Sequence, residues 1–95
     1  PAFAKHKKVL NNALQGYRKL NAKAFEKIRP GGILFTFSCS QVVSKENFRL
    51  AVFSAAAQSG RNVRILHQLT QPADHPVNIY HPEGEYLKGL VLYVE

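Results

Sequence analysis

The sequence has 95 residues, of which 45% are hydrophobic, so it can form one domain with a modest core. Its single cysteine excludes an internal disulfide and favours a reducing compartment such as the cytoplasm over a disulfide-rich secreted class. No apolar run approaches the roughly 18 to 20 residues that a membrane span needs. The basic start leads into residues too polar for a signal peptide. We therefore expect a soluble cytoplasmic protein.

The net charge of +7 is concentrated near the start of the chain. Residues 1–29 contain eight Lys or Arg residues against one Glu, whereas residues 65–95 contain one Lys against four Asp or Glu residues. Such a positive field attracts nucleic acid through its phosphates. A lysine-rich helix face in water explains the same charges equally well. Charge alone leaves both interpretations open.

The first predicted element is an amphipathic helix over residues 5–29. Its apolar positions recur at steps of three or four, as on one face of a helix; they are Leu10, Leu14, Tyr17, Leu20, Ala24 and Ile28. We expect Tyr17 to belong to the core. Gly16 weakens the middle of this helix, and Pro30-Gly31-Gly32 ends it.

A strand is predicted at 32–38, where an unbroken apolar run follows the turn at Gly31-Gly32 and ends on Cys39, between Ser38 and Ser40. A run of this kind is typical of a strand buried on both faces, as in a parallel sheet. Ligands of open α/β sheets bind at the carboxyl ends of such strands, where Cys39 lies. A cysteine in this place can also be a small buried hydrophobic residue.

The remaining elements complete an α/β pattern in a single domain, 1–95. Ser44 is a predicted N-cap for a second helix that closes at Gly60, and a strand follows at 63–68. A long loop rich in Pro and His precedes a last strand at 86–94. The order is helix, strand, helix, strand, strand. Because a helix connects the first two strands, we expect them to be parallel, with the last strand antiparallel.

Several separated motifs occur in an order that resembles a known family. They are Pro1-Ala2-Phe3-Ala4-Lys5, Gly16-Tyr17-Arg18-Lys19-Leu20-Asn21, Gly31-Gly32-Ile33-Leu34, Ser38-Cys39-Ser40, Asp74-His75-Pro76 and Pro82-Glu83-Gly84-Glu85-Tyr86-Leu87-Lys88-Gly89-Leu90. Together they resemble the C-terminal portion of bacterial S-adenosylmethionine-dependent methyltransferases. The most similar group is the 23S ribosomal RNA cytosine-5 methyltransferases that carry an N-terminal PUA domain.

This resemblance implies part of a class I, Rossmann-like methyltransferase sheet, with the last strand antiparallel and inserted between the other two. It also implies S-adenosylmethionine as cofactor and ribosomal RNA as partner. The family's cofactor loops would lie mostly outside this chain, whose cofactor-binding residues stay unknown. We therefore expect a fragment that is inactive alone.

The resemblance assigns roles to individual residues. Cys39 matches the family's nucleophile, which adds to C6 of cytosine so that C5 can attack a methyl group. Members often have Thr-Cys-Ser-Cys where this chain has Thr36-Phe37-Ser38-Cys39, so the first cysteine is replaced. Pro1 and Phe3 match the second Pro and the Phe of an Asp-Pro-Pro-x-Phe motif, which implies that the chain begins inside it. With Ser40 and His75 they are the candidate substrate-binding residues.

Alternatives come from other classes. The basic charge is also consistent with a noncatalytic RNA-binding module, and a free Pro1 amine with a small tautomerase. The four His and one Cys lack metal-ligand spacing, so we expect no metal. Asp74 and His75 can equally cap a loop and lie in solvent. A homodimer is considered as the oligomeric state.

Overall fold

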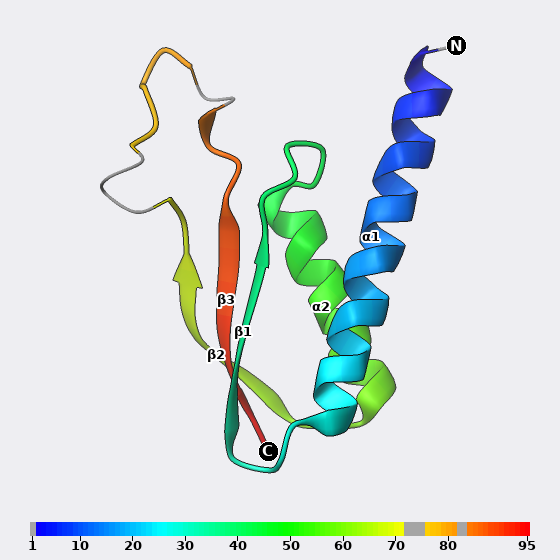
Figure 1. The fold of residues 1–95 in the computed structure, drawn as a ribbon, viewed down its shortest axis with the longest axis vertical. Helices are drawn as coiled ribbons and strands as arrows, with labels where there is room; N and C mark the ends of the chain where they lie inside the picture. The colour runs from blue at the N-terminus through cyan, green and yellow to red at the C-terminus, as the bar shows by residue number, and fades with distance from the viewer. Residues whose placement is uncertain (1, 72–75, 82–83) are drawn as a thin grey trace.

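The computed structural model describes residues 2–71, 76–81 and 84–95, with side chains from Ala4 onward, and contains two layers (Figure 1). A sheet of three strands forms one layer and two helices form the other. In chain order the elements are α1 (Ala2–Lys27), β1 (Gly32–Ser38), α2 (Lys45–Ser59), β2 (Val63–Leu69) and β3 (Lys88–Val94). The predicted order of helix, strand, helix, strand, strand is confirmed.

The sheet has the order β1-β3-β2, and β3 is antiparallel to both neighbours. The strands β1 and β2 therefore run in the same direction, with the last strand between them, as the resemblance implied. The register places Ser38 opposite Lys88 on one side of β3, and Val63 opposite Val94 on the other. This pairing joins the end of β1 to the start of β3.

The helix α1 is continuous through Gly16, whose absent side chain faces open space. It begins three residues earlier than predicted, at Ala2, and ends two residues earlier than predicted, at Lys27. Its apolar stripe packs against α2 and the sheet, with Phe25 fully buried. The prediction was wrong for Leu20, which is 65% exposed because it lies beside the buried face of the helix and not on it. The ring of Tyr17 packs edge-on against Phe48 of α2 at 5.5 Å between centroids, so its predicted place in the core is confirmed. No helix in the described part of the chain is long and apolar enough to cross a membrane.

The ends of α2 follow the local sequence signals. The Ser44 hydroxyl accepts a hydrogen bond from the backbone N–H of Asn47 at 3.0 Å, so it is the predicted N-cap. At the other end Gly60 has φ of 72°, a left-handed conformation that glycine adopts without strain. Between these caps Phe48, Val52 and Ala55 are buried.

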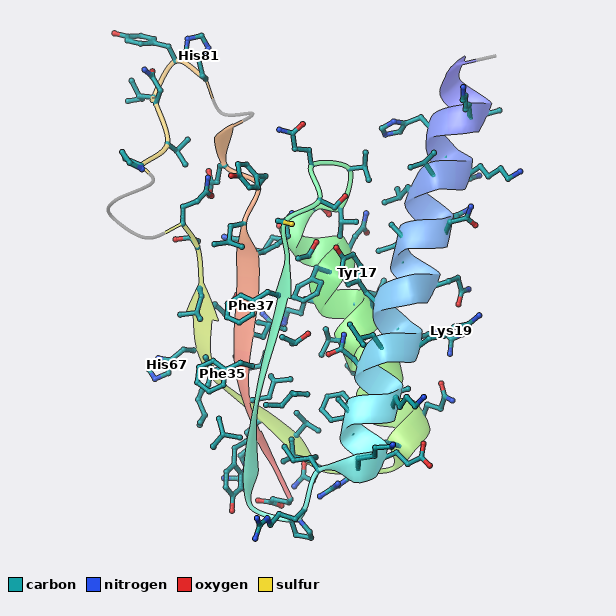
Figure 2. All side chains as sticks on the ribbon, viewed as in Figure 1. Tyr17, Lys19, Phe35, Phe37, His67 and His81 are labelled. Carbon is teal, nitrogen blue, oxygen red and sulfur yellow. The ribbon has the colours of Figure 1, made fainter. Side chains whose placement is uncertain are left out.

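The burial of β1 differs from the prediction of a strand buried on both faces. Its side chains alternate, and Ile33, Phe35 and Phe37 are exposed, with Phe35 at 59%. Figure 2 shows Phe35 and Phe37 directed away from α1. The prediction was wrong because β1 lies at the edge of an antiparallel sheet whose other face no described element covers. The strand that is buried along nearly its whole length is β3. At Gly89 of this strand the ring of Phe37 occupies the space that a Cβ atom would need.

Candidate active site

The end of β1 is held from the helix side by a buried hydroxyl pair. Ser38 is 2% exposed, and its hydroxyl donates to the phenol oxygen of Tyr17 at 2.8 Å. The same hydroxyl accepts a hydrogen bond from the backbone N–H of Ser40 at 3.3 Å. Tyr17 reaches this position from the middle of α1 (Figure 2). The contacts fix the backbone on both sides of Cys39.

Cys39 directly follows the last residue of β1, and it is exposed. This agrees with the expectation that a nucleophilic thiol is accessible at the strand end, and it excludes the alternative of a small buried hydrophobic residue. A thiol needs access and a suitable electrostatic environment to react as thiolate. The structure supplies the access directly.

Lys88 also belongs to this strand end, although it was not among the predicted site residues. It lies opposite Ser38 at the start of β3 and is only 7% exposed. Its ammonium donates to the carbonyl oxygens of Ser40 at 2.7 Å and Tyr86 at 2.5 Å. These two bonds tie the residue after Cys39 to the segment that enters β3.

The charge of Lys88 is not neutralised by a described carboxylate. The ion pair in the described residues joins Arg64 to Glu95 at 3.6 Å, at the other end of β3. Burial lowers the pKa of Lys88, and the neighbouring Cys39, as thiolate, acts to raise it. The two groups therefore interact through their charges.

A signal for Lys88 was present in the sequence. Lys88 interrupts a run of β-forming residues, so its side chain either faces solvent from the strand or is a buried cation. Only the register with β1, which brings it opposite Ser38, decides between them. A buried ionisable residue with a shifted pKa in a strand-end site is a candidate functional residue.

The other predicted site residues are placed unevenly. Ser40 is half-buried beside Cys39 and contributes its backbone N–H and carbonyl to the contacts described above. Pro1 and His75 lie outside the described residues, as does Asp74, and the side chain of Phe3 is not described. The described residues contain no group of three His, Cys, Asp or Glu side chains that could hold a metal ion.

Comparison with curated proteins identifies the relatives of this chain, although no protein-family model matches it. It is 48% identical over 92 residues to ribosomal RNA large subunit methyltransferase I of Tolumonas auensis, 45% to that of Aeromonas salmonicida and 44% to that of Cronobacter sakazakii. The matches cover 97 to 99% of the chain. The chain is homologous to one segment of these methyltransferases. The predicted resemblance is therefore confirmed, and the segment spans about a quarter of the relatives' length, 23 to 24%.

Solved structures confirm the fold of this methyltransferase segment. A protein from Streptococcus mutans described as a SAM-dependent methyltransferase matches 84% of the chain with a TM-score of 0.73 and 18% identity, over 21% of its own length. A second structure, described as a methyltransferase complexed with SAH, matches with the same TM-score over 20% of its length. At this identity the likeness shows the fold alone, and it agrees with the Rossmann-like α/β architecture that the sequence predicted.

Proposed function

We propose that the protein containing this segment transfers a methyl group from S-adenosylmethionine to C5 of a cytosine in 23S ribosomal RNA, with Cys39 as nucleophile. The observation that carries this proposal is the exposed thiol at the end of β1, beside the buried ammonium of Lys88. The names of the relatives support the reaction and the class of RNA. The neighbour that is complexed with SAH supports the cofactor. A cytoplasmic location is consistent with a ribosomal RNA substrate.

S-adenosylmethionine would supply the electrophilic methyl group. We assign its binding mainly to parts of the protein outside this segment. Within the segment, the thiolate of Cys39 attacks C6 of the cytosine and forms a carbon–sulfur bond, which makes C5 nucleophilic. Transfer of the methyl group to C5 would leave S-adenosylhomocysteine. A base, which can be a water molecule, then takes the C5 proton, and the C6–sulfur bond breaks, so that the C5–C6 double bond and the thiolate of Cys39 are restored. Lys88 acts as a positioning residue through the carbonyl of Ser40.

The outer edge and open face of the sheet suit a segment of a larger enzyme. Among the described residues β1 pairs with β3 alone, which leaves its other edge without a partner strand. Ile33, Phe35 and Phe37 are exposed next to that edge. We propose that the rest of the methyltransferase domain pairs with this edge, which is a common way to protect an edge strand.

The direct test is covalent trapping. RNA with 5-fluorocytosine at the target position should remain attached to the full-length enzyme on a denaturing gel, because fluorine cannot leave C5 as a proton does. Cys39→Ala and Cys39→Ser should both abolish trapping and methyl transfer. Since Cys39 is exposed, both variants should unfold at nearly the wild-type temperature. An adduct with Cys39→Ala, or methylation at the wild-type rate, would show that Cys39 is not the nucleophile.

A noncatalytic RNA-binding role is the second candidate, and the basic outer face of α1 favours it. It predicts that the full-length protein binds ribosomal RNA but never forms the fluorocytosine adduct. The trapping experiment with wild-type protein therefore separates the two functions.

A further inference from the structure

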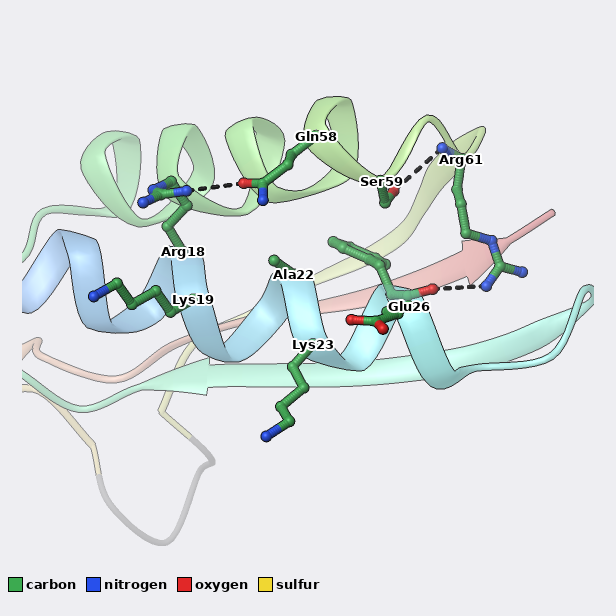
Figure 3. Close-up of a pocket in the computed structure, with 9 residues that line it drawn as sticks. Arg18, Lys19, Ala22, Lys23, Glu26, Gln58, Ser59 and Arg61 are labelled. Carbon is green, nitrogen blue, oxygen red and sulfur yellow. Dashed lines mark hydrogen bonds between the residues drawn. The ribbon is translucent and has the colours of Figure 1, made fainter.

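A second feature of the segment lies on the helix layer, away from Cys39. A groove with a cavity volume of about 600 Å³ separates the C-terminal half of α1 from the end of α2 (Figure 3). Its lining includes Arg18, Lys19, Lys23 and Arg61, against one carboxylate, Glu26. The side chain of Ala22 is small, which leaves the groove open between these longer side chains. The lining is therefore strongly cationic.

Main-chain and side-chain oxygen atoms hold the two guanidinium groups in place. Arg18 donates to the amide oxygen of Gln15 at 2.7 and 3.0 Å, and to that of Gln58 on α2 at 2.8 Å. Arg61 donates to the carbonyl oxygens of Phe25 at 2.7 Å, Ile28, and Glu95 at 3.0 Å. The Nη2 atom of Arg61 is buried without a hydrogen-bond partner in the described structure. Both guanidinium groups are thus fixed in position, and neither forms an ion pair with a described side-chain carboxylate.

The two lysines of the groove are exposed and repel each other. Lys19 and Lys23 are four residues apart and therefore neighbours on one face of α1. Like charges at this spacing destabilise a helix. None of the four cations of the groove forms an ion pair with a described carboxylate. The four cations therefore do not stabilise the fold through ion pairs, whereas an anionic ligand bound in the groove would neutralise their charge.

The positive face continues along α1 toward the end of the fold that holds Cys39. At about 100° per residue, Lys5 and Lys8 lie on the same side of the helix as Lys19 and Lys23. From Lys5 to Lys23 this stripe extends roughly 27 Å, at 1.5 Å per residue. The N-terminal end of α1 lies at the same end of the molecule as the end of β1 (Figure 1). Such an extended row of cations fits a polyanion better than a single phosphate.

We propose that this groove and the lysine stripe of α1 bind the phosphate backbone of the substrate RNA. The groove would hold a phosphodiester between the fixed Arg18 guanidinium and the mobile ammonium groups of Lys19 and Lys23, which suits the geometry of phosphate recognition. The stripe would lead the strand toward the site of Cys39. This inference rests on the proposed RNA methyltransferase function and gives it a second contact with the substrate. Contacts of this kind position the RNA and carry no sequence information.

The test compares two variants of the full-length protein that each lose two positive charges. Lys19→Gln/Lys23→Gln removes the lysines of the groove, and Lys7→Gln/Arg29→Gln removes two cations that neither line the groove nor belong to the lysine stripe. All four side chains are exposed, so both variants should keep the wild-type unfolding temperature. Binding of a 23S ribosomal RNA fragment is measured between 50 and 200 mM salt.

We expect the groove variant to bind about 10- to 50-fold more weakly at 0.1 M salt. Its slope of log affinity against log salt should be less steep by about 1.4 to 1.8, as for two lost phosphate contacts. The control variant should bind within about threefold of wild type. A five-nucleotide fluorocytosine RNA, too short to reach the groove, should be trapped equally by all three proteins.

Equal affinities for the two variants would overturn the inference. A change of sedimentation in the groove variant without a change of RNA affinity would also overturn it, because the groove would then be a protein interface. If wild-type protein traps no RNA but the affinity difference remains, the groove inference holds and the proposed catalysis fails.

Discussion

Replacing Lys88 by Met removes the buried ammonium and keeps most of the aliphatic side chain. The carbonyl oxygens of Ser40 and Tyr86 then lose their donor. Hydrogen bonds to a charged group contribute about 1.5 to 3 kcal/mol each. Lys88 as a whole residue is 7% exposed, and the desolvation of its ammonium offsets several kcal/mol of this gain. We therefore expect a net loss of about 1 to 2 kcal/mol, concentrated at the segment that carries Cys39.

Hydrogen exchange measures this loss where it occurs. A loss of this size corresponds to about 5- to 30-fold faster exchange in peptides that cover residues 38–42. Within the Lys88→Met variant, peptides from β2 should exchange at the wild-type rate. The control variant Lys45→Met changes an exposed lysine at the start of α2, and all of its peptides should exchange at the wild-type rate. Methyl transfer should fall in Lys88→Met and recover in part in Lys88→Arg. Unchanged or slower exchange at 38–42 would refute the reasoning, because the desolvation cost would then exceed the value of both bonds.

Three further predictions concern pH, packing and the cofactor. Burial lowers the pKa of Lys88 in the folded state, so the unfolded state binds more protons between that pKa and 10.5. Lys88 should therefore make the free energy of unfolding rise with pH in that window. Denaturant titrations should show this rise in wild type and not in Lys88→Met, and the same pH dependence in both proteins would contradict it. Tyr17→Phe removes the acceptor of the buried Ser38 hydroxyl and should cost about 1 kcal/mol in urea unfolding, with an unchanged stability arguing that the contact contributes nothing. The 95-residue chain alone should bind S-adenosylmethionine weakly or not at all in calorimetry, and a micromolar dissociation constant would count against this.

Local sequence signals predicted the elements well because each depends on neighbouring residues. The stripe of α1, the N-cap at Ser44 and the left-handed Gly60 all act within a few residues. The burial of β1 was not predictable in this way, since an unbroken apolar run does not specify whether another element covers its second face. The central place of β3 came from the family resemblance and the missing crossover helix. The role of Lys88 needed the β1–β3 register, which joins residues about 50 positions apart.

The strand at the centre of the sheet is the last of the five elements in the chain. During synthesis, β1 and β2 emerge without the strand that both must pair with, and their backbone groups stay in water until Val94 has been made. The helices can pack early, but the sheet forms in one late step, which also brings Lys88 to the carbonyl of Ser40. Long-range pairing of this kind is slow to fold and leaves apolar strands exposed meanwhile. A ribosome that stops before Lys88 therefore releases a chain that has the thiol of Cys39 but lacks the strand that joins β1 to β2.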